Sequence, residues 1–189
     1  MPWTALGFRV HSGWASMVVA AGSPASPNVL VRRRIEIADR KTPGSVQPYH
    51  YAAELDLPSA NAHLARCAAQ SRNLAQTAVE DALQRYKVIA CAILMSSARP
   101  MGTLEATLAS HAAIHSAEGD FFRDAILHAA EACAIPCKKI KEKDLLAAAH
   151  AAFGIDPEPA LADMRRALGP PWTQDEKYAA LAAWLALQS

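Results

Sequence analysis

Near its start the chain carries Leu6-Gly-Phe-Arg-Val-His-Ser-Gly-Trp-Ala-Ser-Met-Val-Val-Ala20, a run rich in β-branched and aromatic residues that is interrupted once, at Ser12-Gly13. Successive side chains of a strand point to opposite faces. One face of the first strand therefore carries Leu6, Phe8 and Val10. The other face carries Gly7, Arg9 and His11. The pattern predicts an antiparallel hairpin that turns at Ser12-Gly13.

A third strand is expected over residues 28–38, where apolar side chains again recur at every second position. Those expected on one face are Val29, Val31, Ile35 and Ile37, and Arg33 interrupts them. Residues 39–58 read as an irregular connecting loop, longer than ordinary connections. A helix with Ser59 as its N-cap is predicted to run to about Tyr86.

Val88 to Met95 is apolar on both alternate faces, which predicts a strand buried in the middle of a sheet. Residues 136–140 form a candidate edge strand rich in lysine. Thr173-Gln-Asp-Glu176 matches a capping box at the start of the last helix. Helices are expected over residues 104–115 and 120–134, with a bend at Gly119, and over 142–153, 158–168 and 173–187.

Composition limits the classes of function. The 189 residues are 52% hydrophobic and fit one domain, residues 1–189. Lys and Arg number 19 against 18 Asp and Glu, so any anion site must be local. The four cysteines fall in apolar patterns and are expected to be reduced thiols of a cytoplasmic protein. The longest apolar run is too short to span a bilayer, and no membrane association is expected.

The first hairpin and the last helix resemble those of ribonuclease H-like families, which include Holliday-junction resolvases and bacterial predicted nucleases. Such families begin with Gly-x-Asp and carry Asp-x-x-Asp in the final helix. Here Arg9 stands in place of the first acid, and Asp175-Glu-Lys-Tyr178 keeps one acid of the pair. The buried strand ends in Ser96-Ser97-Ala98, where the resemblance implies another acid. The resemblance implies an α/β fold: a mixed sheet of three antiparallel strands followed by parallel strands, covered by helices.

Two-metal cleavage needs several carboxylates to offset the repulsion between the cations. A guanidinium at Arg9 would repel those cations instead. We therefore expect a member of the class that is not a standard two-metal nuclease and that binds a small anion, a nucleotide or a protein partner in the crevice beside the first strand. Whether it is an enzyme stays open, and no metal or cofactor is assigned. The candidate pocket residues are Arg9, His11, Ser12, Ser96, His115, Glu118 and Asp175.

Two alternatives remain. His111, His115 and Glu118 are spaced at i, i+4 and i+7, so an uninterrupted helix would place them on one face, as a metal grip, a pocket without metal or a structural cluster. A metal-binding site of this kind would suit a metal-dependent phosphoesterase or nuclease with a rearranged His/Glu site. The other alternative is an assembly module that forms a homo-oligomer through Trp3, Trp172 and Trp184.

Basic residues outside the pocket give two weaker indications. Arg9 and His11 share a strand face, and Arg32 or Arg34 could complete an anion-binding surface there, although a solvated strand face is favoured. Lysines of the kind that contact phosphate backbones cluster near residue 140, diluted by acids, and a solvated edge is favoured. They are Lys138, Lys139, Lys141 and Lys143. A nucleic-acid partner is left open.

Overall fold

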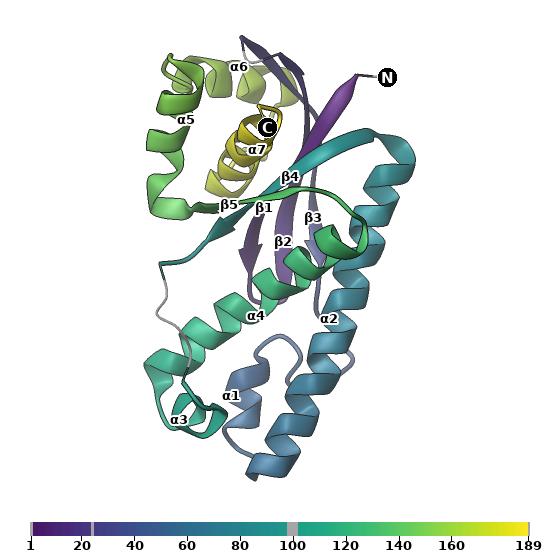
Figure 1. Cartoon of the computed structure of the whole chain (residues 1–189), viewed down its shortest axis with the longest axis vertical. Helices are drawn as coiled ribbons and strands as arrows, with labels where there is room; N and C mark the ends of the chain where they lie inside the picture. Colours follow the sequence, from purple (N-terminus) through teal and green to yellow (C-terminus); the bar gives the residue numbers. More distant parts are fainter. Residues whose placement is uncertain (1, 24, 98–101, 189) are drawn as a thin grey trace.

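The computed structural model describes residues 2–23, 25–97 and 102–188. Its centre is a five-stranded sheet with the order β3-β2-β1-β4-β5 (Figure 1). β1, β2 and β3 form an antiparallel meander, and β4 and β5 run parallel to β1. The bounds are β1 Trp3–His11, β2 Trp14–Ser23, β3 Ser26–Glu36, β4 Lys87–Met95 and β5 Cys137–Lys141. The predicted α/β architecture, the interior position of the apolar strand, which is β4 between β1 and β5, and the lysine-rich edge strand are confirmed.

Helices cover both faces of the sheet (Figure 1). On one face α2 (Leu57–Arg85) and α4 (His111–Ala132) pack on Leu6, Phe8 and Val10 of β1. On the opposite face α5 (Leu145–Phe153), α6 (Glu158–Leu168) and α7 (Gln174–Ala186) enclose a second core. The sheet thus separates two cores, and a side chain's place in the strand alternation decides which helices it meets.

Gly7 allows α7 to lie directly on β1. A Cβ atom at this position would stand 1.9 Å from the carbonyl oxygen of Ala179 and 2.6 Å from the backbone nitrogen of Ala183. Only glycine permits so close an approach between the helix backbone and the strand. Because Arg9 and His11 lie on the same face as Gly7, this packing brings the first turn of α7 towards both.

Three local expectations are wrong. The connecting loop contains a short helix, α1 (Pro48–Ala52). α2 begins two residues before Ser59, and its N-cap is Asp56, whose carboxylate accepts hydrogen bonds from the backbone and hydroxyl of Ser59. α4 runs through Gly119 without a break, and the helix boundary lies earlier, where Ser110 separates α4 from α3 (Leu104–Leu108). Asp and Ser are about equally good N-caps, so the residue types alone do not choose between Asp56 and Ser59, and one helical glycine costs only about 1 kcal/mol.

The expected single apolar face of the third strand is also wrong. The register between β2 and β3 shifts between Val19 and Ala20, so one additional residue of β3 lies in the ladder there. An extra residue reverses the alternation beyond it. Val29 consequently joins the core under α7, while Ile35 and Ile37 join the core under α2 and α4.

The tryptophans proposed for subunit packing have different environments. Trp184 is fully buried and stacks on Phe153, with ring centroids 3.9 Å apart, so its proposed role in packing against another subunit is wrong. Trp3 is 56% exposed and lies under the ammonium group of Lys87. Trp172 is partly buried beside Arg32. In the described parts of the chain, no helix is both long and apolar enough to cross a membrane.

Candidate functional site

Arg9 forms the centre of an ion-pair network at the carboxyl ends of the parallel strands. Its Nε and Nη2 atoms donate to the two carboxylate oxygens of Glu142, at 3.2 and 2.7 Å, which makes the pair bidentate. Its Nη1 atom donates to Asp175 Oδ1. Asp175 lies in the first turn of α7, and Glu142 begins the 3₁₀ turn Glu142–Asp144 that follows β5. Three elements far apart in sequence therefore meet at one guanidinium.

His11 extends the network along β1. Its Nε2 atom lies 2.7 Å from the same Oδ1 atom of Asp175 that Arg9 contacts. The imidazole stacks on Trp14 across the hairpin, with ring centroids 4.3 Å apart. The guanidinium of Arg34 also lies over the Trp14 ring, 4.1 Å from its centroid. The carboxylate of Asp175 is thus held by two nitrogen donors on one strand face.

The pKa values of the network follow from these contacts. Burial acts to raise the pKa of Asp175, but hydrogen bonds and charge from His11 and Arg9 outweigh it, and the pKa lies below its ordinary value. The hydrogen bond to Glu142 is the main cause of the raised pKa of Arg9, with burial acting against it. Both groups remain charged at neutral pH, so one guanidinium is ion-paired with two carboxylates from different elements.

A hollow of about 390 Å³ lies beside this network. Its lining comes from the end of β4 and the residues after it, the 3₁₀ turn, the start of α5 and the first half of α7. It comprises Met95, Ser96, Ser97, Glu142, Lys143, Leu146, Gln174 and Tyr178. In α/β sheets, ligands bind outside the carboxyl ends of the strands. The crevice expected beside the first strand therefore has a counterpart in the structure, next to β4.

The predicted pocket residues do not form one pocket. Arg9, His11 and Asp175 come together on the α7 face of the sheet. His115 and Glu118 belong to α4, which covers the opposite face, so the expectation that they line the same crevice is wrong. The reason is geometric: a five-stranded sheet stands between the two helices, and no spacing in the sequence indicates which face a helix covers.

The other two predicted residues lie at the margins. Ser96 lines the hollow and donates to Asp120 Oδ1 at 3.3 Å. Ser12 is exposed in the hairpin turn, as the turn interpretation predicted. Glu142 is the residue that sequence reasoning missed. Its only signal was its place directly after the lysine-rich edge strand.

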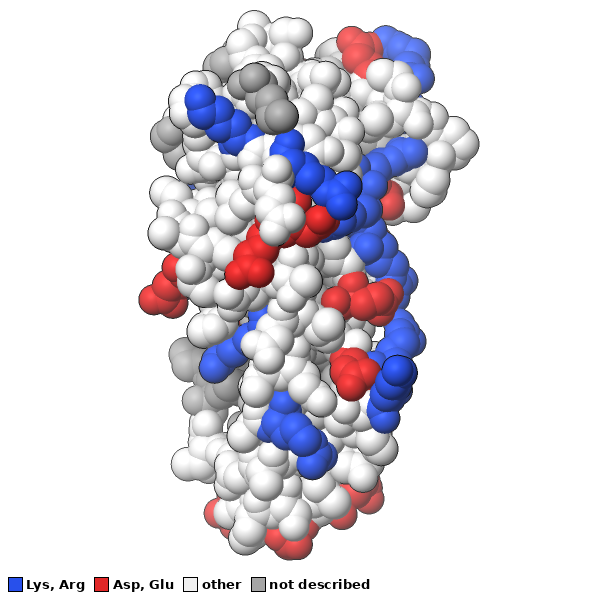
Figure 2. Space-filling view, turned by 90° about the vertical axis from the view of Figure 1, so that its right-hand side faces the viewer, with Lys and Arg blue, Asp and Glu red and all other residues white. Residues whose placement is uncertain are grey.

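The suggested anion-binding surface around Arg9 is wrong. Arg32 donates to the carbonyl oxygens of residues 168–170 at the end of α6, and Arg34 pairs with Glu36 at 2.7 Å. Figure 2 shows that basic and acidic side chains interleave on the side of the molecule that carries α2. There Arg33 pairs with Asp81. These three arginines therefore bind groups of the same chain and form no common anion site with Arg9.

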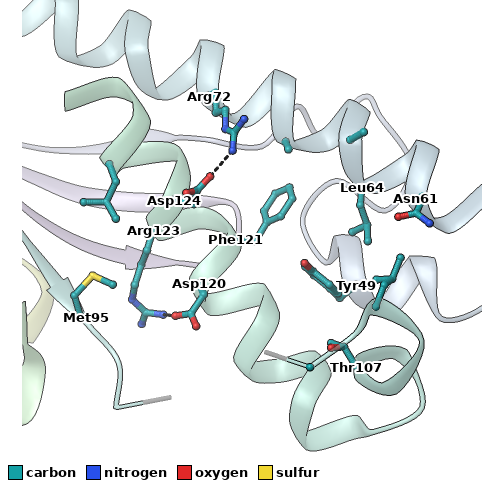
Figure 3. A pocket seen from close by; sticks show the side chains of 15 residues that line it. Tyr49, Asn61, Leu64, Arg72, Met95, Thr107, Asp120, Phe121, Arg123 and Asp124 are labelled. Carbon is teal, nitrogen blue, oxygen red and sulfur yellow. Dashed lines mark hydrogen bonds and ion pairs between the residues drawn. The ribbon is translucent and has the colours of Figure 1, made fainter. Parts of the chain in front are cut away.

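On the other face of the sheet, a larger cavity of about 640 Å³ lies between α1, α2, α3 and α4 (Figure 3). Apolar side chains such as Leu64 and Phe121 form part of the wall. Its guanidinium groups are paired, Arg72 with Asp124 and Arg123 with Asp120, at 2.6 and 3.3 Å. Burial, followed by the charges of Asp120 and Asp124, raises the pKa of Tyr49 above its ordinary value. The sequence gave no indication of this cavity, because its walls come from four separate segments.

Solved structures with the same arrangement include RuvC of Thermus thermophilus. RuvC in complex with a Holliday junction substrate superposes with a TM-score of 0.58 at 12% identity, covering 98% of this chain and 93% of that chain. Another T. thermophilus RuvC structure gives 0.53 at 15% identity, covering 98% and 93%. The yeast mitochondrial Holliday junction resolvase Ydc2 gives 0.45 at 13%, covering 97% and 76%. The sequence matches no protein-family model and no curated protein. Similarity at this level defines the fold: the chain has a ribonuclease H-like fold, as predicted.

Proposed function

We propose that this protein is a ribonuclease H-like domain that binds nucleic acid without cleaving it by two-metal chemistry. One observation carries the proposal: the Arg9 guanidinium is bonded to both Glu142 and Asp175, at the carboxyl ends of the parallel strands. The position from which related scaffolds would hold cations is therefore filled by a side chain that carries its own positive charge.

The residues present do not fit a pair of divalent cations. At about 4 Å and an effective dielectric constant of about 20, two unit charges interact by about 4 kcal/mol, and a divalent ion beside a guanidinium by about twice that. Glu142 and Asp175 are already ion-paired with Arg9, and Asp175 also accepts a hydrogen bond from His11. Guanidinium remains protonated at any physiological pH, so this repulsion cannot be titrated away.

Exposed lysines at the β5 edge of the sheet support nucleic acid as the partner. Four lysines along β5 and the 3₁₀ turn are exposed, and none of them forms an ion pair with another described residue. They are Lys138, Lys139, Lys141 and Lys143. Lys143 also lines the hollow beside Arg9. Unpaired lysines in a row suit the phosphate backbone, whose recognition needs charge and spacing and no base contacts. RuvC of the same fold has been solved with a Holliday junction substrate, which makes branched DNA the first probe.

The test measures binding and cleavage together. Fluorescence anisotropy with a four-way DNA junction and a matched linear duplex, over a range of salt concentrations, gives affinity and its salt dependence. The double variant Lys138→Ala/Lys141→Ala should lower the slope of log affinity against log salt by about 2, because each lost phosphate contact removes about 0.9. The control is Lys41→Ala/Lys87→Ala, which removes two lysines outside the β5 edge. The same samples are incubated with Mg²⁺ or Mn²⁺ and should leave the junction intact.

Two results would overturn the proposal. Metal-dependent cleavage by the wild type that disappears in Asp175→Asn would identify a working nuclease centre. Absence of junction and duplex binding even at low salt would remove nucleic acid as the partner and favour a small nucleotide or a protein. Equal slopes in the two double variants would locate binding away from β5.

A further inference from the structure

We propose that His50, His111 and His115 form a binding site for a divalent transition-metal ion of the Zn²⁺ type. One ring nitrogen from each imidazole lies within 4.8 Å of the others. The site lies on the α2 and α4 side of the sheet, away from Arg9, so it does not depend on the proposed function. α4 supplies two of the histidines and α1 the third.

The two histidines of α4 are already placed to share an ion. They are one turn apart, and their Nε2 atoms lie 2.9 Å from each other. Zn–N bonds of about 2.0–2.1 Å at tetrahedral angles place ligand nitrogens about 3.3 Å apart, close to this separation. Both residues lie in the first two turns of α4, so one helix positions both imidazoles.

His50 closes the group from α1. Its ring centroid lies 4.8 Å from that of His115 and 5.6 Å from that of His111. The position of His50 is set by Glu118, which accepts the backbone N–H of His50 at 3.2 Å. The five-residue helix α1 is therefore held against α4 at the point where the third ligand is needed.

Glu118 is the observation that makes the cluster more than three neighbouring histidines. Its side chain is 3% exposed, and its Oε1 atom lies 2.9 Å from Nδ1 of His50, although not in the direction of a linear hydrogen bond. Among the described residues, His50 is its only ion-pair partner. A buried carboxylate requires compensation. Metal-bound imidazoles typically direct their second nitrogen to such a carboxylate, which leaves Nε2 for the ion.

The ligand set indicates the kind of metal. Three neutral imidazoles suit Zn²⁺, Co²⁺, Ni²⁺ or Cu²⁺, whereas Mg²⁺ and Ca²⁺ require oxygen ligands. Within the described parts of the chain, the group holds three candidate ligands, which leaves one tetrahedral position for water or an anion. His111 and His115 are exposed, so an ion can enter from solvent.

The experiment uses the full chain after dialysis against a chelator. Titration with Co²⁺ should produce the visible absorption of a tetrahedral site at one ion per chain, and Zn²⁺ should abolish it by competition. Zn²⁺ should also raise the melting temperature, since it binds the folded state. Glu118→Gln should weaken affinity by about 10–100-fold, and His50→Ala and His115→Ala should weaken it further.

His128→Ala is the matched control, because His128 is exposed on the same helix and lies outside the cluster. It should bind both ions as the wild type does. Failure of the wild type to bind Co²⁺ or Zn²⁺ at micromolar concentration would overturn the site. Unchanged affinity in His50→Ala would also overturn it, because the exposed pair on α4 would then bind the ion alone.

Discussion

The two faces of the sheet carry polar clusters of opposite kinds. Under α7, Arg9 is compensated by carboxylates from two other elements, and every charge has its partner within the chain. Between α1 and α4, three imidazoles lie close together, and one of them, His50, contacts the buried carboxylate of Glu118, which has no lysine or arginine paired to it among the described residues. The cluster around Arg9 therefore needs no ligand to pair its charges, whereas the histidine cluster offers ring nitrogens to a cation from solvent.

The largest effect is expected where the α7 face is packed most tightly. Gly7→Ala would place a methyl group inside the backbone of α7, and overpacking of this kind costs about 3 kcal/mol of unfolding free energy. Displacing α7 would also separate Asp175 from Arg9. Urea denaturation measures the loss. Gly102→Ala, whose added Cβ would meet only an ordinary contact at 3.7 Å, serves as the control and should change stability little.

Removing the central charge tests whether the first cluster is self-sufficient. Arg9→Met leaves Glu142 without its ion-pair partner and Asp175 with His11 alone, and should cost about 2 kcal/mol, less than a fully buried pair because the site is partly exposed. His111→Ala without added metal should cost less than about 0.5 kcal/mol, since its side chain is exposed. Chemical denaturation of the two variants compares the faces directly. Equal losses would contradict the distinction between them.

An effect smaller than that of Arg9→Met is expected in the dependence of stability on pH. The folded-state pKa of Asp175 lies below its unfolded value of about 3.9, so this carboxylate contributes stability above about pH 4 and loses it as the pH falls through the lowered pKa. Asp175→Asn should therefore be less stable than the wild type by about 1 kcal/mol at pH 7. The difference should shrink on acidification in urea melts. Asp144→Asn, an exposed position, should show no such trend, and a constant difference for Asp175→Asn would contradict the assigned cause.

Much of the fold follows from local pattern. The period of two placed Arg9 on the face opposite Leu6, and the apolar run ending at Met95 predicted an interior strand of the sheet. The capping box identified the start of α7, where the backbone N–H of Thr173 is accepted by Glu176 at 2.7 Å. These signals lie within a few residues of one another, which is the range over which helix and strand periods can be read.

The candidate sites were less predictable. The i, i+4 and i+7 spacing correctly placed His111, His115 and Glu118 on one helix, but His50 lay in a segment expected to be an irregular loop. Glu142 could not be connected with Arg9, because the alternation of a strand does not indicate what packs above it. The prediction that His115 and Glu118 share a crevice with Arg9 was wrong for the same reason.

The chain's own order of residues therefore fixed which side chains share a strand face or a helix face, because those relations depend on backbone periods of 2 and 3.6 residues. The arrangement of helices over the sheet decided which of these faces come into contact. Arg9 and Glu142 are 133 positions apart, and His50 and Glu118 are 68 apart. Contacts across such distances depend on which face of the sheet each helix covers, and that choice is made by burial of the two cores as a whole.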